Sequence, residues 1–163
     1  MLVRERTPED AEWIERLLVQ RWGSTVMVVH GDTYDAATLP ALVAGAQDGL
    51  ATYRIIGDEA ELVTLDAVRP GLGVGSALVE ALVDRLRGTG VRRLRVTTTN
   101  DNLDALRFYQ RRSFRLLRLR AGAVDEARRI KPAIPETGAH GIPLHDEIDL
   151  WRSIPGTPAE GSG

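Results

Sequence analysis

The chain has 163 residues, of which 43% are hydrophobic and 27% charged, with a formal net charge of −2 and no cysteine. This length and composition suit one globular domain with a hydrophobic core. The lack of cysteine excludes disulfides, thiolate nucleophiles and cysteine metal sites. The small net charge argues against a nucleic-acid partner. No segment approaches the roughly 20 apolar residues that span a bilayer. The first six residues are too charged for a secretory signal, so we expect a cytoplasmic protein with no membrane partner.

In the first half of the chain, helical spacing and capping residues predict a helix that begins at Thr7-Pro8 and closes at Trp22-Gly23. The β-branched, apolar residues 25–30 indicate a strand. Residues 33–44 are expected to form a loop and a short helix around Pro40. Two further strands, 50–56 and 61–68, are joined by a hairpin turn at residues 57–59.

In the second half, an apolar stripe that begins at Val74 predicts a helix ending at Gly88. It is followed by a strand over 92–98, a helix over 102–112, a strand over 114–119 and a short helix over 125–129. Residues 131–143 contain three prolines and two glycines, which predicts a structured loop. A last strand covers 147–151. This order predicts a single mixed α/β domain over 1–154 and a frayed tail over 155–163.

Closely spaced glycines separate the strand 61–68 from the next helix, in the order Gly71, Leu72, Gly73, Val74, Gly75, Ser76. Such a loop presents backbone N–H groups at the positive end of a helix dipole, which favours a phosphate or pyrophosphate. No lysine follows, so the loop is not a P-loop, and the glycine spacing does not match a dinucleotide fingerprint. A tight strand-to-helix turn without a ligand is the other interpretation.

A second motif follows, in which Asn102, Ala105 and Tyr109 share one stripe of a helix, with Asn102 placed to cap it. Together with Leu65-Asp66-Ala67-Val68, the glycine loop and Phe114, this pattern resembles the GNAT superfamily of acetyl-CoA-dependent N-acetyltransferases. The resemblance runs from Met1 to about Trp151. There are two departures: Pro70 stands where the family usually has Arg or Gln, and Ser113 where it usually has Gly. Arg69 is a candidate to supply the missing charge.

The resemblance implies a mixed, mostly antiparallel central sheet flanked by helices and splayed between the strands 61–68 and 92–98. It implies acetyl-CoA as co-substrate, with no metal. The residues that it assigns to the cofactor are Ala67, Val68, Gly71, Leu72, Gly73, Val74, Gly75, Ser76, Asn102 and Tyr109.

The resemblance further implies direct attack of an amine on the thioester, because no cysteine is present to form an acyl-enzyme. A backbone N–H near Ala67 or Val68 would stabilise the oxyanion. Tyr109 is the expected acid for the departing thiolate, with packing against CoA as the alternative. Asp66 is the expected base, although strand alternation can point it away from the site. The other candidates for the base are Asp32, Glu61, Glu147 and Asp149.

The acceptor is expected to be a small-molecule amine or a protein amino group, and a homodimer is one expected assembly. Acidic residues suited to a cationic amine are Asp32, Asp35, Asp146 and Glu147. The Pro- and Gly-rich segment 128–147 is either a rigid loop over a sheet edge or a wall of the acceptor site. His30, His140 and His145 lack metal-ligand spacing and are expected at the surface or in loops.

Two other functions stay open. The first is a non-catalytic module that binds or senses acyl-CoA, which the departure at Pro70 and the uncertain base motivate. The second is a nucleotide-binding module.

Overall fold

The computed structural model describes residues 1–156. The chain folds into two compact units, each of which is described by itself. The first unit comprises residues 1–25, 36–94 and 153–156, and the second comprises residues 26–35 and 95–152. Most of the predicted tail, residues 157–163, lies outside the described residues, and the prediction of a single domain over 1–154 stays a prediction.

Four antiparallel strands form the sheet of the first unit, in the order β1 (Val3–Glu5), β4 (Ala41–Ala44), β5 (Gly49–Ile56) and β6 (Glu59–Ala67). All four residues of β4 are buried. The turn at Gly57 joins β5 to β6, as the hairpin signal predicts.

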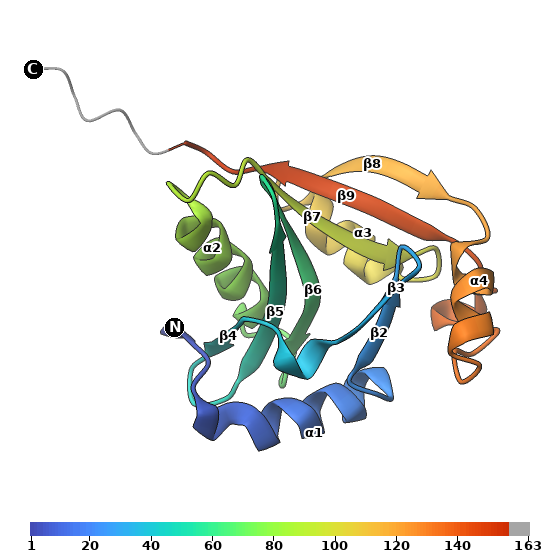
Figure 1. The fold of residues 1–163 in the computed structure, drawn as a ribbon, viewed down its shortest axis with the longest axis horizontal. Helices are drawn as coiled ribbons and strands as arrows, with labels where there is room; N and C mark the ends of the chain where they lie inside the picture. The colour runs from blue at the N-terminus through green and yellow to red at the C-terminus, as the bar shows by residue number, and fades with distance from the viewer. Residues whose placement is uncertain (157–163) are drawn as a thin grey trace, which may run out of the picture. The chain divides into compact units, whose positions relative to one another are not determined.

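Two helices cover this sheet, and both can be followed in Figure 1. A 3-10 turn (η1, Pro8–Asp10) leads into α1 (Ala11–Trp22), while α2 (Val74–Leu86) follows the glycine loop. A Cβ on Gly49 would come within 2.3 Å of Val74 Cγ1, so this glycine lets the start of α2 approach the sheet. Gly49 pairs with Ala67, whereas the neighbouring Asp66 contacts Trp22 of α1. Because strand side chains alternate between faces, the start of α2 and the end of α1 lie on opposite faces of the sheet.

The second unit contains most of β7 (Arg93–Thr99), the antiparallel pair β8 (Arg115–Arg120) and β9 (Glu147–Ser153), and the hairpin of β2 (Val26–Val29) with β3 (Asp32–Asp35). Helix α3 (Leu103–Gln110) packs on β8, and α4 (Ala123–Ile130) packs on β2. The loop after α4 contains a 3-10 turn (η3, Ala139–Gly141) and one bridge between Thr137 and Pro143.

The predicted class, a mixed α/β fold with a mostly antiparallel sheet and flanking helices, is confirmed. The expected splay between the strands 61–68 and 92–98 stays a prediction. The expectation of a loop and helix over residues 33–44 is wrong, because this segment contains β3, a 3-10 turn (η2, Ala36–Thr38) and β4. Alanine and leucine favour helices, but here pairing with β1 and β5 makes Ala41–Ala44 a strand. The strand β1 was not predicted. Within residues 1–156, no helix is both long and apolar enough to traverse a bilayer.

Candidate functional site

Two residues of the glycine loop adopt backbone conformations that suit glycine. Gly71 (φ +82°) and Gly73 (φ +73°) both adopt left-handed conformations, and a Cβ built on either would have nothing within 4 Å. Gly73 caps α2, and the N–H of Ala77 donates to its carbonyl at 3.0 Å. The N–H groups of a helix's first turn have no partners inside the helix and carry the positive end of its dipole. Gly71 and Gly73 thus leave open space beside the start of α2, where an anion is favoured.

At the end of β6, the backbone N–H groups of Ala67 and Val68 have different roles. Val68 donates its N–H to Asp48 O on the β5 side, at 2.8 Å. Because N–H directions alternate along an antiparallel strand, the N–H of Ala67 points away from β5. The N–H of Val68 is thus used within the sheet, so of the two expected oxyanion donors Ala67 stays the candidate.

The residues around Pro70 are exposed. Arg69 places its guanidinium 3.8 Å from the Asp48 carboxylate, and its side chain is 72% exposed. Leu72 is exposed by 57% at the tip of the loop. An exposed ion pair at this distance contributes little to stability. Arg69 can therefore exchange Asp48 for an anion that it binds more strongly.

Asp66 is buried on the face of the sheet that carries α1. Its two carboxylate oxygens lie 2.9 and 3.2 Å from Trp22 Nε1, which donates to them. Burial raises the pKa of Asp66 above its ordinary value, against the opposing effects of the Trp22 hydrogen bond and the Arg21 charge. This carboxylate thus fixes the end of α1 to β6 through a neutral donor.

In the second unit, Asn102 and Tyr109 have the local roles that the sequence predicts. The side-chain oxygen of Asn102 accepts from the N–H of Ala105 at 3.1 Å and caps α3. Tyr109 is 7% exposed, and its ring meets those of Phe108 and Phe114 edge to face, with centroids 5.2 Å apart in each pair. Such contacts fix the direction of the phenol.

The turn after α3 explains one departure from the family pattern. Ser113 has φ +70°, a left-handed conformation that favours glycine. This departure from the family pattern therefore affects a turn.

Sequence analysis missed a cluster of charged and polar groups around His30. His30 Nε2 lies 2.9 Å from Thr97 Oγ1 on β7 and 3.2 Å from Asp149 Oδ1 on β9. Arg120 NH1 donates to His30 Nδ1, while its NH2 donates to Glu147 at 2.5 Å and to Asp149 at 3.1 Å. Glu147 and Asp149 are both buried, and the His30 side chain is only 20% exposed. His30 lies in a turn, as predicted, and most of its side chain is buried.

A pocket of about 330 Å³ opens beside this cluster, between the β2–β3 turn and α4. Its apolar wall consists of Val28, Ala123, Ala127 and Ile130. Its polar lining consists of His30, Arg120, Glu126 and Glu147. A volume near the lower end of the ligand-site range, roughly 300–1,000 Å³, suits a small molecule.

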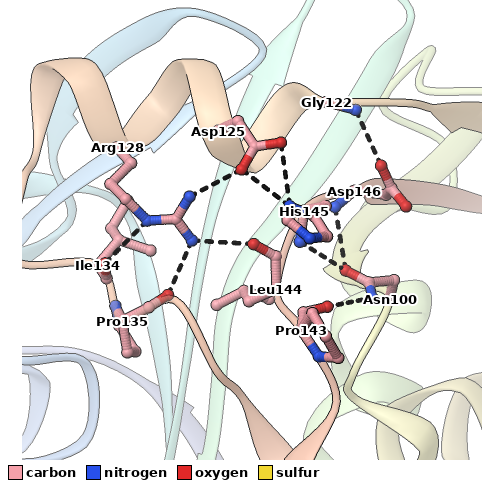
Figure 2. A network of polar contacts seen from close by, with 10 residues as sticks. All are labelled: Asn100, Gly122, Asp125, Arg128, Ile134, Pro135, Pro143, Leu144, His145 and Asp146. Atoms are coloured by element: carbon pink, nitrogen blue, oxygen red, sulfur yellow. Dashed lines mark hydrogen bonds and ion pairs between the residues drawn. The ribbon is translucent and has the colours of Figure 1, made fainter.

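The segment after α4 is held rigidly by the network in Figure 2. Arg128 donates to the carbonyls of Ile134 at 3.1 Å, Pro135 at 2.8 Å and Leu144 at 2.9 Å, and to the carboxylate of Asp125 at 2.8 Å. One guanidinium therefore fixes the loop to α4, the helix that carries one wall of the pocket.

Asn100, at the end of β7, binds the far end of this loop (Figure 2). Its side-chain oxygen accepts from the N–H groups of His145 and Asp146, each at 3.0 Å, and its amide donates to Pro143 O at 2.8 Å. Asp146 in turn accepts from the N–H of Gly122 at 2.8 Å, just before α4. The loop after α4 therefore holds α4 in place, while of the segment 128–147 only Ile130 and Glu147 line the pocket. Both interpretations of the segment stay predictions.

The other acidic and histidine candidates have structural partners or lie in solvent. Glu61 is buried against Arg54 at 2.9 Å, and the exposed His145 is 3.0 Å from Asp125. Asp32 and Asp35 are exposed at the two ends of β3. In the part of the chain that the structure describes, His, Asp and Glu form no group of three or more suited to a metal ion.

Comparison with known proteins places these observations in a family. The family model described as "Acetyltransferase (GNAT) family" matches residues 13–114. The uncharacterized protein YxbD of Bacillus subtilis is 35% identical over 153 residues, which cover 91% of this chain and 95% of YxbD.

Solved structures show the same fold at low identity. A GNAT family acetyltransferase from Elizabethkingia anophelis, with acetyl-CoA bound, has a TM-score of 0.63 at 17% identity, covering 93% of this chain and 97% of that one. The ribosomal-protein-S18-alanine N-acetyltransferase of Escherichia coli has a TM-score of 0.62 at 17% identity, covering 99% of each chain. The family match extends over more than half of the sequence, and this chain therefore belongs to the GNAT acetyltransferase family.

Proposed function

We propose that this protein transfers an acetyl group from acetyl-CoA to a primary amine by direct attack. The observation that carries the proposal is the glycine loop, where Gly71 and Gly73 leave open space beside the start of α2. In the related structure from Elizabethkingia anophelis, acetyl-CoA is bound.

The proposed cofactor contacts are those that the family resemblance assigns. The pyrophosphate would be held by the loop and the first turn of α2, and the pantetheine by the edge of β6 toward which the Ala67 N–H points. Asn102 and Tyr109 of α3 would supply the remaining contacts. Arg69 would turn from Asp48 to the phosphates, which compensates for Pro70.

In the proposed reaction, a neutral amine nitrogen attacks the thioester carbonyl carbon. The C–N bond forms, the carbonyl oxygen accepts the N–H of Ala67, and the C–S bond then breaks. Tyr109 gives its phenolic proton to the departing thiolate, and the amide loses its extra proton to a base. An unperturbed phenol, with a pKa near 10, is protonated at neutral pH and suits this role.

Asp66 is the base suggested by the sequence, and the acceptor is either a small-molecule amine or a protein amino group. The raised pKa of Asp66 favours proton uptake, which supports that choice. The structural neighbour from Escherichia coli is named for acetylating an alanine of a ribosomal protein, so a protein acceptor has precedent in this fold.

Thiol release from acetyl-CoA with a panel of primary amines tests the proposal. Tyr109→Phe should lower turnover by about 100-fold or more while the dissociation constant of CoA stays within about twofold. Tyr53→Phe, which removes the hydroxyl of another buried tyrosine, is the matched control and should leave turnover unchanged.

Binding of CoA without turnover of any amine would instead support a non-catalytic CoA-binding module. Preferential thermal stabilisation by NAD or ATP would support a nucleotide-binding module and count against CoA.

A further inference from the structure

We propose that the pocket beside α4 binds the acceptor as a small primary ammonium with an apolar body, and that His30 is the base that takes its proton. This inference rests on the proposed function and goes further, because it names the acceptor class and replaces Asp66 by His30 as the base.

The backbone at His30 is the first argument. Val29 pairs with Asp32, so His30 and Gly31 form a two-residue turn, and both have positive φ, +55° and +76°. A turn of this kind favours Asn-Gly, because asparagine tolerates the left-handed region better than most residues. Histidine therefore holds this position at a local energetic cost, and unfavourable backbone conformations of this kind concentrate at functional sites.

The hydrogen bonds around His30 are the second argument. A guanidinium can only donate, so the contact from Arg120 makes Nδ1 the acceptor and places the ring proton on Nε2. Nε2 then faces Thr97 and Asp149, while Thr97 donates its own hydroxyl to Asp149 at 2.7 Å. The His30 ring thus lies between a guanidinium and a carboxylate, and Asp149 would stabilise the imidazolium that forms when the ring takes a proton.

The charge of the pocket is the third argument. Glu126, Glu147 and the adjacent Asp149 carry negative charge, and Arg120 is the one cationic side chain among the groups that line the described pocket. This excess of carboxylates favours a cation. The opposite wall, Val28 with Ala127 and Ile130, suits an aliphatic or aromatic body. A carboxylate on the acceptor would face the acidic lining and be rejected.

His30 and Asp66 differ in what they face. The Asp66 carboxylate is buried and receives the indole N–H of Trp22. His30 lines the pocket, and its Nε2 lies 2.9 Å from Thr97 Oγ1 of β7. Of the two, His30 has the access that an acceptor amine requires.

The ammonium enters the pocket and displaces Arg120 NH1 from His30 Nδ1, while Arg120 NH2 keeps its bonds to Glu147 and Asp149. The N–H bond of the ammonium breaks and its proton passes to Nδ1. The imidazolium, stabilised by Asp149, releases this proton to water, and the neutral amine attacks the thioester. The freed Nδ1 then accepts the extra proton of the new amide nitrogen.

The decisive variant is His30→Asn. Asparagine suits the turn better than histidine, so the variant should fold with unchanged or higher thermal stability, yet it has no group to take the proton. We expect kcat/KM for the best amine to fall by about 100-fold or more, with the dissociation constant of CoA unchanged within about twofold. A merely structural role for His30 would leave kcat/KM unchanged in this well-folded variant.

Two variants serve as comparisons. His140→Asn is the matched control, because His140 also has a positive φ, +58°, and is exposed. His140→Asn should change the thermal stability as much as His30→Asn does, but it should leave kcat/KM unchanged. Asp66→Asn tests the other candidate base: a loss of about 100-fold in kcat/KM there, with full activity in His30→Asn, would overturn the inference and leave the proposed function standing.

The acceptor class is tested with amines that differ in one feature. Pentylamine should give a kcat/KM at least about tenfold above that of norleucine, which adds a carboxylate. Glu126→Gln should lower the ratio of the kcat/KM values for the two amines. Glu136→Gln, which changes an exposed residue in the loop after α4, should leave this ratio unchanged.

Equal use of both amines, or a strong preference for peptide N-termini, would overturn the assigned class. Failure of the wild-type protein to bind acetyl-CoA would instead refute the proposed function itself.

Discussion

The glycine loop and the pocket beside α4 are built in opposite ways. The loop is one continuous segment, residues 71–76, whose contribution is backbone N–H groups and the absence of side chains at Gly71 and Gly73. The pocket is made of side chains from the β2–β3 turn, β8, α4 and β9, with a buried cluster of charges at one end.

Both regions contain left-handed residues, but the energetic situation differs. In the loop these positions are glycines, for which the conformation costs little. At the pocket the residue is His30, whose conformation a β-carbon opposes and the surrounding hydrogen bonds must maintain. The glycines of the loop therefore keep their backbone conformation without support from neighbouring side chains. His30 keeps its conformation only while the charged and polar cluster around it is intact.

The largest expected effect comes from removing the cation of the cluster. Arg120→Met would leave Glu147 and Asp149 buried without their guanidinium, which should lower the free energy of unfolding by about 3–5 kcal/mol. Urea denaturation measures this loss. Arg118→Met, on an exposed residue of the same strand, should change stability by less than about 0.5 kcal/mol. A loss below about 1 kcal/mol in Arg120→Met would show that the pocket does not depend on this cluster.

The next effect contrasts two buried aspartates with opposite pKa shifts. Burial raises the pKa of Asp66, whereas at Asp149 burial is outweighed by the hydrogen bonds from His30 and Thr97 and by the Arg120 charge, so its pKa is lowered. The stability contributed by Asp149 is present above the unfolded pKa, near 3.9, and is lost as the pH falls through the folded value. That of Asp66 is present below the unfolded pKa and is lost as the pH rises through the folded value.

At pH 7, Asp149→Asn should therefore lower the free energy of unfolding by about 1–2 kcal/mol, and by less at pH 3. Asp66→Asn keeps an oxygen for Trp22 and should be at least as stable as the wild type at pH 7, with no advantage at pH 4. Urea titrations of the three proteins between pH 3 and 8 measure both trends. The same pH dependence of the free energy of unfolding in both variants would contradict the opposite pKa shifts of Asp66 and Asp149.

The smallest effect is expected at the loop. Gly73→Ala forces a β-carbon into the left-handed region at a cost of roughly 1–2 kcal/mol, which should weaken CoA binding by about tenfold. Gly57→Ala is a matched control, because Gly57 also has a positive φ, +62°, with nothing within 4 Å of a built Cβ. It should lose similar stability but keep its CoA affinity. Calorimetry distinguishes the two, and equal CoA affinity in both variants would remove the loop from the cofactor site.

The sequence by itself determined the parts of this protein that arise from local rules. The capping box at Thr7 before η1, the cap of α3, the hairpin at Gly57 and the glycine loop depend on residues within a few positions of one another, and each was predicted. The combination of the glycine loop with Asn102 and Tyr109 indicated the family for the same reason, because two short motifs in a fixed order can be recognised in the sequence alone.

Only the tertiary structure decided which side chains meet. Residues 41–44 have the composition of a helix but form a strand, because the neighbouring strands supply their hydrogen bonds. His30 is 90 residues from Arg120, and no local pattern links the two. The direction of Asp66 likewise followed from its contact with Trp22. The physical reason is the same in each case: a buried charge or an ambiguous strand is fixed by partners that the fold brings from far along the chain.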